Sequence, residues 1–429
     1  MKAAVPILAL AVAALSQVFE PADFNVTEAL LSNGVDVSAI PGLSGLAERS
    51  TLGGCSVACN ALEIVFGSNV ILGGNTDYAN FSSAYWYQSP IGVGGLTTGG
   101  GISFFAGMHG WACDNVEAFE VVTASGLIVA ATPTSYADLY WALRGGRNNF
   151  GLVTNFKLRT LPLGKMWGGD RVLLENQFPA AIDVFVNLGK NSAQDPKAAQ
   201  ILSFVVQGGS KFASAQLEYA EPNTNASIFT EWNAITPIVD NTGIHTLSEL
   251  TEMLSAANPY GDRQSYWAQT YKLDKDLINY ILTVFFEEGD KLANVTNLLN
   301  PLSLQVITVP QLQQMQQNGG NALGLSPEEG PLLLINPAPA WTDARDDDSV
   351  NRVANTLIQK TVAEAQKRRL ASEYIYMNYA SKFQDVIASY GPVNKARLKD
   401  IARKYDPKEV FQLLQPGYFK LDGPPAVLV

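Results

Sequence analysis

IGVGGLTTGGGISFFAGMHGWACDNV, residues 91–116, is the stretch from which the fold of this chain can be predicted. It is rich in glycine, and its only charged side chain is Asp114. Glycine has no Cβ, so it reaches positive φ and allows another group to lie directly against the backbone. The stretch is therefore either a cradle for a cofactor or a tight apolar turn between strands.

A second glycine-rich cluster, RGGRNNFGLVT at residues 144–154, follows a predicted helix and opens a predicted strand. Two such clusters favour the cradle over a simple turn. Neither cluster has the Gly-Lys-Ser/Thr ending of a mononucleotide P-loop, and neither has the glycine spacing of a Rossmann fingerprint. The sequence therefore argues against both of these standard nucleotide-binding motifs.

The motifs GVGGLTTGGGISF, GWACDNV, FEVVTASG and DLYWALRGGRNNFGLVTNFKLRT occur in that order. They resemble the second half of the FAD-binding lobe in the berberine-bridge-enzyme-like branch of the vanillyl-alcohol-oxidase flavoproteins, notably its secreted fungal members. The run YIYMNYASKFQDVIASYG, followed by LKDIARKYDPKEVFQLLQPGYFKL, is similar to the closing segment of that family. The resemblance covers most of the chain from Cys55 onward. It implies an α+β flavoprotein of two lobes with FAD bound between them.

The resemblance also implies site residues and a reaction. In the family, hydride passes from a small organic substrate to the flavin, a base takes a proton, and dioxygen reoxidises the flavin. The implied base is Tyr376. The implied cofactor-binding residues are Gly94, Gly95, Leu96, Thr97, Gly99, Gly100, Gly101, Ile102, Asp114, Asn115, Gly151, Val153 and Asn378. We expect a secondary-metabolite intermediate as the substrate, with an oligosaccharide aldose as the second choice.

Residues 374–379, YIYMNY, are predicted to form a strand. Alternation along a strand would place Tyr374, Tyr376 and Asn378 on one face. On composition alone, these residues would be assigned to sheet packing. A free tyrosine has a pKa near about 10, so a base at neutral pH needs a neighbouring positive charge or donor, which the sequence does not identify.

The sequence departs from the family pattern where Gln88-Ser89-Pro90 leads directly into the glycine stretch. Relatives carry there a portion with an Arg- and Gly-rich pyrophosphate loop, often with a histidine that binds FAD covalently. The counterpart of a second attachment residue, a cysteine, falls at about Gln88. We therefore expect any FAD to be non-covalent and weakly held, because diphosphate binding needs convergent N–H donors. A catalytically inactive remnant or a non-enzymatic binding protein is the alternative.

Composition limits the class of protein. The 429 residues are 47% hydrophobic and 16% charged, which suits two domains with substantial cores. The net charge is −11, and no basic cluster is longer than residues 367–369, which argues against nucleic acid as a partner. The two histidines, His109 and His245, occur without a CxxC motif, so no metal site is expected.

The N-terminus predicts secretion. A basic start, an apolar run at residues 3–15 and a small-residue ending indicate a signal peptide of residues 1–16, cleaved near Gln17. No later apolar run reaches the roughly 18 residues of a membrane span. Four sequons predict N-glycans at Asn25, Asn80, Asn225 and Asn294.

The three cysteines are Cys55, Cys59 and Cys113. Cys55 and Cys59 share one predicted helical face, which fits buried packing as well as a disulfide, although such a pair is poorly placed for bridging. Cys113 is predicted to pack rather than to act as a nucleophile, because His109 alone lies near it and has no assigned role.

The chain is predicted to divide at Pro162-Leu163-Gly164. Residues 17–164 would form a truncated FAD-binding domain, residues 165–370 a substrate domain, and residues 371–429 a segment that returns to the first lobe. In the first domain we expect a hairpin over residues 119–131, which turns at residues 124–126.

The first domain should also contain a helix that begins at a capping box of Ser135 with Asp138 and ends at Gly145. After it, a strand is expected. Its apolar positions alternate with polar ones, so they should form a buried face composed of Leu152, Phe156 and Leu158.

In the second domain, strands are predicted at residues 198–208, 213–221, 264–273 and 302–309. Thr246 with Glu249, and separately Asp274, should cap two helices, and a third helix has an apolar face of Val350, Val353, Ala354 and Leu357. Five large aromatic residues could stack on a substrate ring but are favoured as core: Trp232, Tyr266, Trp267, Tyr271 and Trp341.

Overall fold

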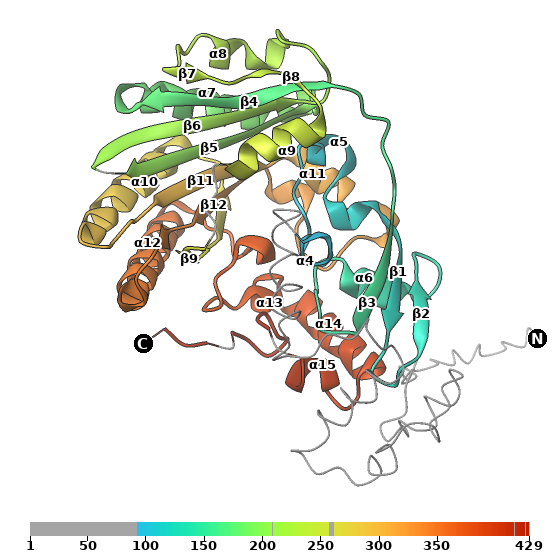
Figure 1. The fold of residues 1–429 in the computed structure, drawn as a ribbon. Helices are drawn as coiled ribbons and strands as arrows, with labels where there is room; N and C mark the ends of the chain where they lie inside the picture. The colour runs from blue at the N-terminus through green and yellow to red at the C-terminus, as the bar shows by residue number, and fades with distance from the viewer. Residues whose placement is uncertain (1–91, 208, 257–260, 416, 425, 429) are drawn as a thin grey trace, which may run out of the picture.

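The computed structural model describes residues 92–207, 209–256, 261–415, 417–424 and 426–428. These residues form a three-stranded sheet and an eight-stranded antiparallel sheet, with helices packed against both (Figure 1). The predicted α+β class is confirmed. The predicted signal peptide, Cys55, Cys59, the sequons at Asn25 and Asn80, and the departure at Gln88 lie outside the described residues.

The smaller sheet has the order β2-β1-β3, with β1 (Val116–Val122), β2 (Ile128–Ala131) and β3 (Leu152–Leu158). The predicted hairpin is confirmed: the N–H of Gly126 donates to the Thr123 carbonyl at 3.0 Å. Gly126 has φ 90°, a conformation that favours glycine.

The predicted buried face of β3 is wrong. Leu152 is 54% exposed and Leu158 is 39% exposed, whereas Phe156 is half-buried against Phe119. The register between β3 and β1 shifts at two points, and each irregularity breaks the alternation of buried and exposed positions. The simple period of two therefore does not hold along this strand.

Helix α6 (Ala137–Leu143) ends near Gly145 as predicted, but the predicted capping box is wrong. The residue before the helix, Tyr136, is left-handed and makes no side-chain cap. Asp138 instead binds the C-terminal helix α14 (Pro392–Tyr405), through Lys404 Nζ at 2.7 Å and Tyr405 Oη at 2.8 Å. Partners that are distant in sequence have replaced the local cap.

The larger sheet has the order β10-β12-β11-β5-β6-β4-β7, and β8 also pairs with β4. Helices α7 (Phe178–Asn191), α10 (Lys275–Gly289) and α12 (Asp347–Arg368) contribute to the hydrophobic core on one face. The strands are β4 (Met166–Leu174), β5 (Ala198–Gln207), β6 (Ser210–Tyr219), β7 (Val239–Asp240), β8 (Gly243–His245), β10 (Gln269–Lys272), β11 (Asn300–Ile307) and β12 (Leu332–Pro337).

The prediction of one strand over residues 264–273 is wrong, whereas the strands predicted at 198–208, 213–221 and 302–309 are confirmed. The chain instead forms β9 (Arg263–Gln264), which pairs with β13 (Ala340–Trp341), and then β10, which joins the large sheet. Two different pairing partners divide the apolar run.

The helix caps of the second domain are as predicted. Thr246 and Glu249 form a reciprocal box at the start of α9 (Leu247–Ala256), with the Thr246 N–H 2.7 Å from Glu249 Oε2. Asp274 Oδ1 accepts from the Leu277 N–H at 2.8 Å and caps α10. In α12 the predicted apolar face is buried except for Val353, which is half-buried.

The C-terminal segment packs against the first lobe (Figure 1). The predicted strand at residues 374–379 is wrong: an extended stretch leads into a short 3-10 helix (Met377–Tyr379). The reason is that its backbone groups bond within turns and to side chains, as in the Ile375 N–H that donates to Ser389 Oγ at 3.0 Å. Helix α13 (Val386–Ser389), α14 and α15 (Val410–Leu413) complete the segment.

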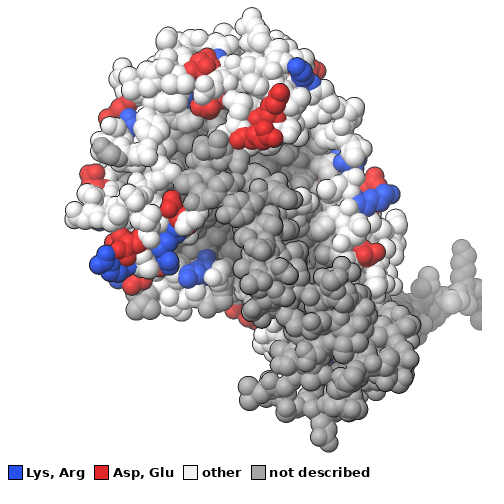
Figure 2. Space-filling model, viewed as in Figure 1, with Lys and Arg blue, Asp and Glu red and all other residues white. Residues whose placement is uncertain are grey.

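Charged side chains on the face shown in Figure 2 are scattered, with acidic and basic groups interspersed among larger uncharged areas. No helix in the described part of the chain has both the length and the apolar character that crossing a bilayer requires.

Candidate functional site

The glycine stretch begins as a short helix, α4 (Val93–Thr98), and continues as a loop. The N–H groups of Gly99 and Gly100 return to carbonyls of α4 at 3.0 and 3.3 Å. Those of Gly101 and Ile102 donate to the hydroxyl oxygen of Tyr376 at 3.1 and 3.0 Å. The backbone donors expected to face the flavin are thus bonded to protein acceptors at all four of these positions.

Protein atoms also fill the space beside the glycines. A Cβ on Gly99 would overlap Asn378 Oδ1, one on Gly100 would lie 2.7 Å from the Trp111 ring, and one on Gly101 would lie 2.6 Å from Ala112 Cβ. Real Cβ atoms do not approach neighbours so closely. At these positions the structure supports the tight-packing interpretation of the glycine stretch.

Tyr376 is the centre of this packing. Its hydroxyl oxygen accepts from Gly101, Ile102 and the Asn378 amide, which lies at 3.0 Å, while the Trp111 and Tyr379 rings pack against it. Burial raises the pKa of Tyr376 above its usual range, and the three donors oppose this only in part. The side chain is therefore a neutral phenol at neutral pH.

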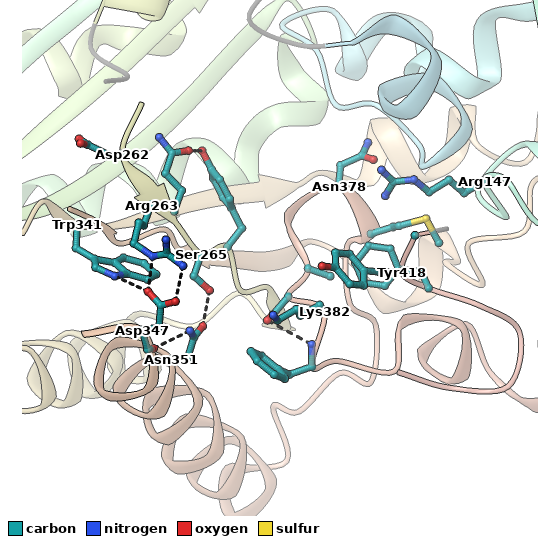
Figure 3. A pocket seen from close by; sticks show the side chains of 18 of the residues that line it. Arg147, Asp262, Arg263, Ser265, Trp341, Asp347, Asn351, Asn378, Lys382 and Tyr418 are labelled. Atoms are coloured by element: carbon teal, nitrogen blue, oxygen red, sulfur yellow. Dashed lines mark hydrogen bonds and ion pairs between the residues drawn. The ribbon is translucent and has the colours of Figure 1, made fainter. Parts of the chain in front are cut away.

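A cavity of about 940 Å³ opens beside this cluster, which is within the size range of small-molecule sites. In Figure 3, Arg147, Asn378 and Tyr418 lie on one side and Lys382 lies between the two sides. The other side carries Arg263, Ser265, Trp341, Asp347 and Asn351. One wall comes from the second glycine cluster and the C-terminal segment, and the other comes from β9, β13 and α12.

The second wall is organised around an ion pair. Arg263 forms a two-pronged ion pair with Asp347, and the Trp341 indole N–H donates to the same carboxylate at 2.9 Å. The Arg263 hydrogen bonds hold the pKa of Asp347 below its usual range. Asp262 lines the same side of the cavity and forms no ion pair with another described residue. This wall therefore combines a paired Arg263–Asp347 group with one further carboxylate.

The first wall holds polar groups that lack partners. Asn148 Oδ1 is buried without a hydrogen bond, and the Arg147 guanidinium forms no ion pair or side-chain hydrogen bond with another described residue. Such groups suit a bound molecule that carries both N–H donors and negative charge, as FAD does. The residues present therefore fit the cofactor that the sequence resemblance implies.

The predicted site residues separate into two groups. Leu96, Gly99, Gly101, Ile102, Tyr376 and Asn378 are brought together, and Asn378 lines the cavity. Gly95 lies close to Arg147, with 3.6 Å between an ideal Cβ and the guanidinium. Thr97 is buried within α4, and Gly94 faces the Phe156 ring.

The other predicted residues bond or pack away from the cavity. Asp114 accepts from the Trp111 N–H and from Asn321 Nδ2, both at 2.9 Å, and lies 4.0 Å from the buried Arg144. Asn115 donates to two carbonyls of its own loop. Gly151 packs against Val121, and Val153 is half-buried in β3. Neither Asp114 nor Asn115, Gly151 or Val153 lines the cavity.

Sequence reasoning missed Arg147, Lys382, Tyr418 and the Arg263–Asp347 pair. The position of Arg147 inside the second glycine cluster was the one available signal. The remaining residues belong to stretches without a recognisable motif. Cys113 is fully buried and its thiol pKa is raised by burial, so the prediction that it packs in the core is confirmed.

Among the five aromatic residues favoured as core, Trp232, Trp267, Tyr271 and Trp341 are buried, and Trp341 also borders the cavity. Tyr266 is 40% exposed and lines the cavity, so the core prediction is wrong there. Tyr266 lies in the connection between β9, where Gln264 pairs with β13, and β10, where Gln269 joins the large sheet.

Curated relatives have sequences similar to most of the chain. It is 36% identical over 347 residues to the FAD-dependent monooxygenase tpcD of Cochliobolus heterostrophus, covering 77% of this chain and 67% of the relative. It is 34% identical to the FAD-dependent monooxygenase FUP4 of Fusarium proliferatum (77% and 66%) and 33% identical to the bifunctional solanapyrone synthase of Alternaria solani (76% and 62%). The chain spans about two thirds of the length of these relatives.

Solved structures share the fold. Berberine bridge enzyme matches with a TM-score of 0.59 at 16% identity, covering 82% of this chain and 75% of the enzyme. The VAO-type flavoprotein MtVAO615 of Myceliophthora thermophila matches with a TM-score of 0.54 at 21% identity (75% and 60%). No family model matches the sequence. The chain therefore has the fold of the berberine-bridge-enzyme-like, vanillyl-alcohol-oxidase-type flavoproteins and belongs to the family of FAD-linked oxidoreductases that includes these FAD-dependent monooxygenases.

Proposed function

We propose that this protein is a secreted oxidase that uses non-covalently bound FAD to oxidise a small secondary-metabolite intermediate, with dioxygen as electron acceptor. The observation that carries the proposal is the 940 Å³ cavity. On the wall that also holds Asn378, neither Asn148 Oδ1 nor the Arg147 guanidinium has a side-chain partner among the described residues. The bifunctional solanapyrone synthase among the relatives supports the substrate class.

FAD, when bound, supplies the acceptor for two electrons, and the protein supplies orientation and proton handling. Asn148 and Asn378 offer hydrogen bonds, and Arg147 offers positive charge to the cofactor side of the cavity. The described residues that line this cavity include neither histidine nor cysteine, the side chains that attach flavin in the family. This supports non-covalent binding.

Tyr376 is the proposed base for the substrate proton. The three N–H donors that converge on its oxygen would stabilise a phenolate, as donors to a charged form lower its free energy. Burial acts in the opposite direction. We therefore expect turnover to rise with pH through the alkaline range, because deprotonation of Tyr376 becomes easier there.

The first test is chemical. Purified protein is first incubated with candidate substrates, and the hydrogen peroxide formed is measured. The protein is then precipitated with acid, and the supernatant is examined for flavin absorbance. Flavin in the supernatant together with peroxide is the expected result. Flavin retained in the precipitate would reject non-covalent binding, and a protein that neither contains nor takes up FAD would support the inactive remnant instead.

The second test concerns Tyr376. Tyr376→Phe is expected to lower turnover by about 10²-fold or more while FAD stays bound, since general base catalysis contributes that much. Tyr374→Phe is the matched control, because the Tyr374 hydroxyl is also buried but has no hydrogen-bond partner in the described part of the chain. A loss below about threefold for Tyr376→Phe would remove it from the role of base.

Secretion has its own support and test. The sequons at Asn225 and Asn294 lie at exposed positions, where a glycan can be accommodated. Mass spectrometry of protein from the culture medium should show a chain that starts near Gln17 with glycan mass at these sites. An intact Met1 without any glycan would contradict the proposal.

A further inference from the structure

Arg147 has an unusual backbone conformation for its type. Its φ is 57°, in the left-handed region that disfavours side chains with a Cβ. Its backbone N–H donates to the Thr98 carbonyl at 3.2 Å, which ties the second glycine cluster to the end of α4. A glycine would adopt this conformation without strain, so the tertiary structure holds an arginine here at a cost in stability.

The guanidinium makes few favourable interactions with the described residues. It lies 5.6 Å from the Phe419 ring and forms no ion pair or hydrogen bond with another side chain of the described residues. Burial lowers its pKa, which reports a desolvated positive charge. On the opposite wall Asp347 already pairs with Arg263, and Asp262 lies on the far side of the cavity from Arg147 in Figure 3. Arg147 is thus a half-buried cation that forms no ion pair with a described carboxylate.

The surroundings leave room for such an anion. Gly95 has no side chain toward the guanidinium, and an ideal Cβ there would lie 3.6 Å from it. Asn148, next in the chain, has a buried Oδ1 without a partner, and both residues line the 940 Å³ cavity together with Asn378. In Figure 3 the Arg147 and Asn378 side chains lie next to each other at the same end of the cavity.

We propose that Arg147 is the anchor of an anion-binding site in this cavity, and that it takes an oxygen anion whose charge is shared by more than one oxygen or with a ring. The inference rests on the proposed function, since two parts of that reaction offer this chemistry. One is the cofactor, through its diphosphate or the oxygen-bearing edge of its ring system. The other is a carboxylate or acidic enol of the substrate.

Three variants separate charge from backbone strain. Arg147→Lys keeps a positive charge, Arg147→Asn removes it with a residue that tolerates positive φ, and Arg147→Gly removes both the charge and the strain. Lys157→Gln is the matched control, because Lys157 is a strongly exposed cation on β3 that does not line the cavity. The apoprotein of Arg147→Gly should melt at a higher temperature than wild type, which shows that any loss of binding is not a loss of fold.

Four quantities are measured for each variant: FAD affinity, the midpoint potential of the bound flavin, and the affinities for benzoate and for benzyl alcohol as probes. If the cofactor is the anion, Arg147→Asn binds FAD about tenfold or more weakly, or lowers the midpoint potential, and Arg147→Lys retains most of both. If the substrate is the anion, benzoate binding falls by about tenfold or more while FAD and benzyl alcohol bind as before.

Suppose that the wild-type protein binds FAD and that Arg147→Asn has the same FAD affinity, midpoint potential and benzoate affinity. This result would overturn the inference and leave the proposed function standing. Wild type that binds no FAD would reject the proposed function. The inference would then be decided on the apoprotein, where equal benzoate affinity of wild type and Arg147→Asn would overturn it as well.

Discussion

The amide oxygen of Asn378 occupies the position where a side chain on Gly99 would begin. The same Asn378 amide donates to the Leu96 carbonyl at 2.9 Å and to Tyr376 Oη at 3.0 Å. One side chain from the C-terminal segment therefore fixes the glycine stretch through both contact and hydrogen bonding.

Gly99→Ala should destabilise the protein by about 1–3 kcal/mol, because the added methyl group overlaps Asn378 Oδ1. Gly99 has φ −95°, a backbone conformation that alanine also adopts, so the loss of stability would come from the steric clash and not from backbone strain. Urea denaturation provides the measurement, with Gly164→Ala as the control, since an added Cβ there meets no atom within 4 Å.

The effect of Gly99→Ala should be smaller in an Asn378→Ala background. Residues in contact show such coupling in double-mutant cycles, typically about 0.5–3 kcal/mol. An unchanged cost in that background would locate the clash at the Gly95 carbonyl, 3.1 Å away, and contradict the assignment to Asn378.

Tyr376→Phe should also lower stability, independently of its effect on turnover. The N–H groups of Gly101 and Ile102 would lose their acceptor, at about 1–3 kcal/mol for each donor left buried without a partner. Tyr374→Phe should be at least as stable as wild type, because it loses no hydrogen bond among the described residues and removes a buried hydroxyl without a partner. Equal stabilities of the two variants would contradict the hydrogen-bond assignment.

Glu218 predicts a pH-dependent stability. It lies on β6 with both carboxylate oxygens buried and without partners, and burial raises its pKa from 4.5 to about 8. The folded pKa is above the unfolded one, so the protein is most stable in this respect below pH 4.5 and loses stability as the pH rises toward 8.

Glu218→Gln should therefore stabilise the protein by several kcal/mol at pH 8 and have little effect at pH 4. Urea unfolding at both pH values tests this. Glu221→Gln, which removes an exposed partner of Lys197, should change stability by less than about 1 kcal/mol at either pH. A Glu218→Gln variant that is less stable than wild type at pH 8 would show that the carboxylate has a favourable partner.

Cys113 should resist alkylation in the native protein. Its thiol is fully buried, so the alkylating reagent cannot reach the sulfur. Burial also raises the pKa of the thiol, so little of the reactive thiolate is present. Peptide mapping after iodoacetamide treatment should find Cys113 unmodified without denaturant and modified with it. Modification of Cys113 in native protein, at a rate typical of free thiols, would show that the first lobe opens.

The sequence predicted most of the secondary structure that depends on local patterns. Asp274 caps α10 as expected because the cap involves residues three apart. The predictions fail where residues distant in the sequence determine the local structure. Asp138 bonds to α14 instead of capping α6. Residues 374–379 fold around Tyr376 instead of forming a strand. Periodicity contains no information on such contacts.

The site was predictable where it follows motifs. Asn378 was identified from its segment, and it does line the cavity. Arg147 was not identified, because neither its positive φ nor its lack of a carboxylate partner can be inferred from neighbouring residues. The opposite wall is produced by the pairing of β9 with β13, which joins positions far apart in the chain.

The hydrogen bonds from Gly101 and Ile102 to Tyr376 connect positions 275 and 274 residues apart. A ribosome adds residues at about 5–20 per second, so the glycine stretch leaves it roughly a quarter of a minute to a minute before its acceptor exists. During that interval the loop has no tyrosine to organise it, and closing so long a segment is slow. A chain halted before Tyr376 therefore cannot organise the glycine stretch, however much FAD surrounds it.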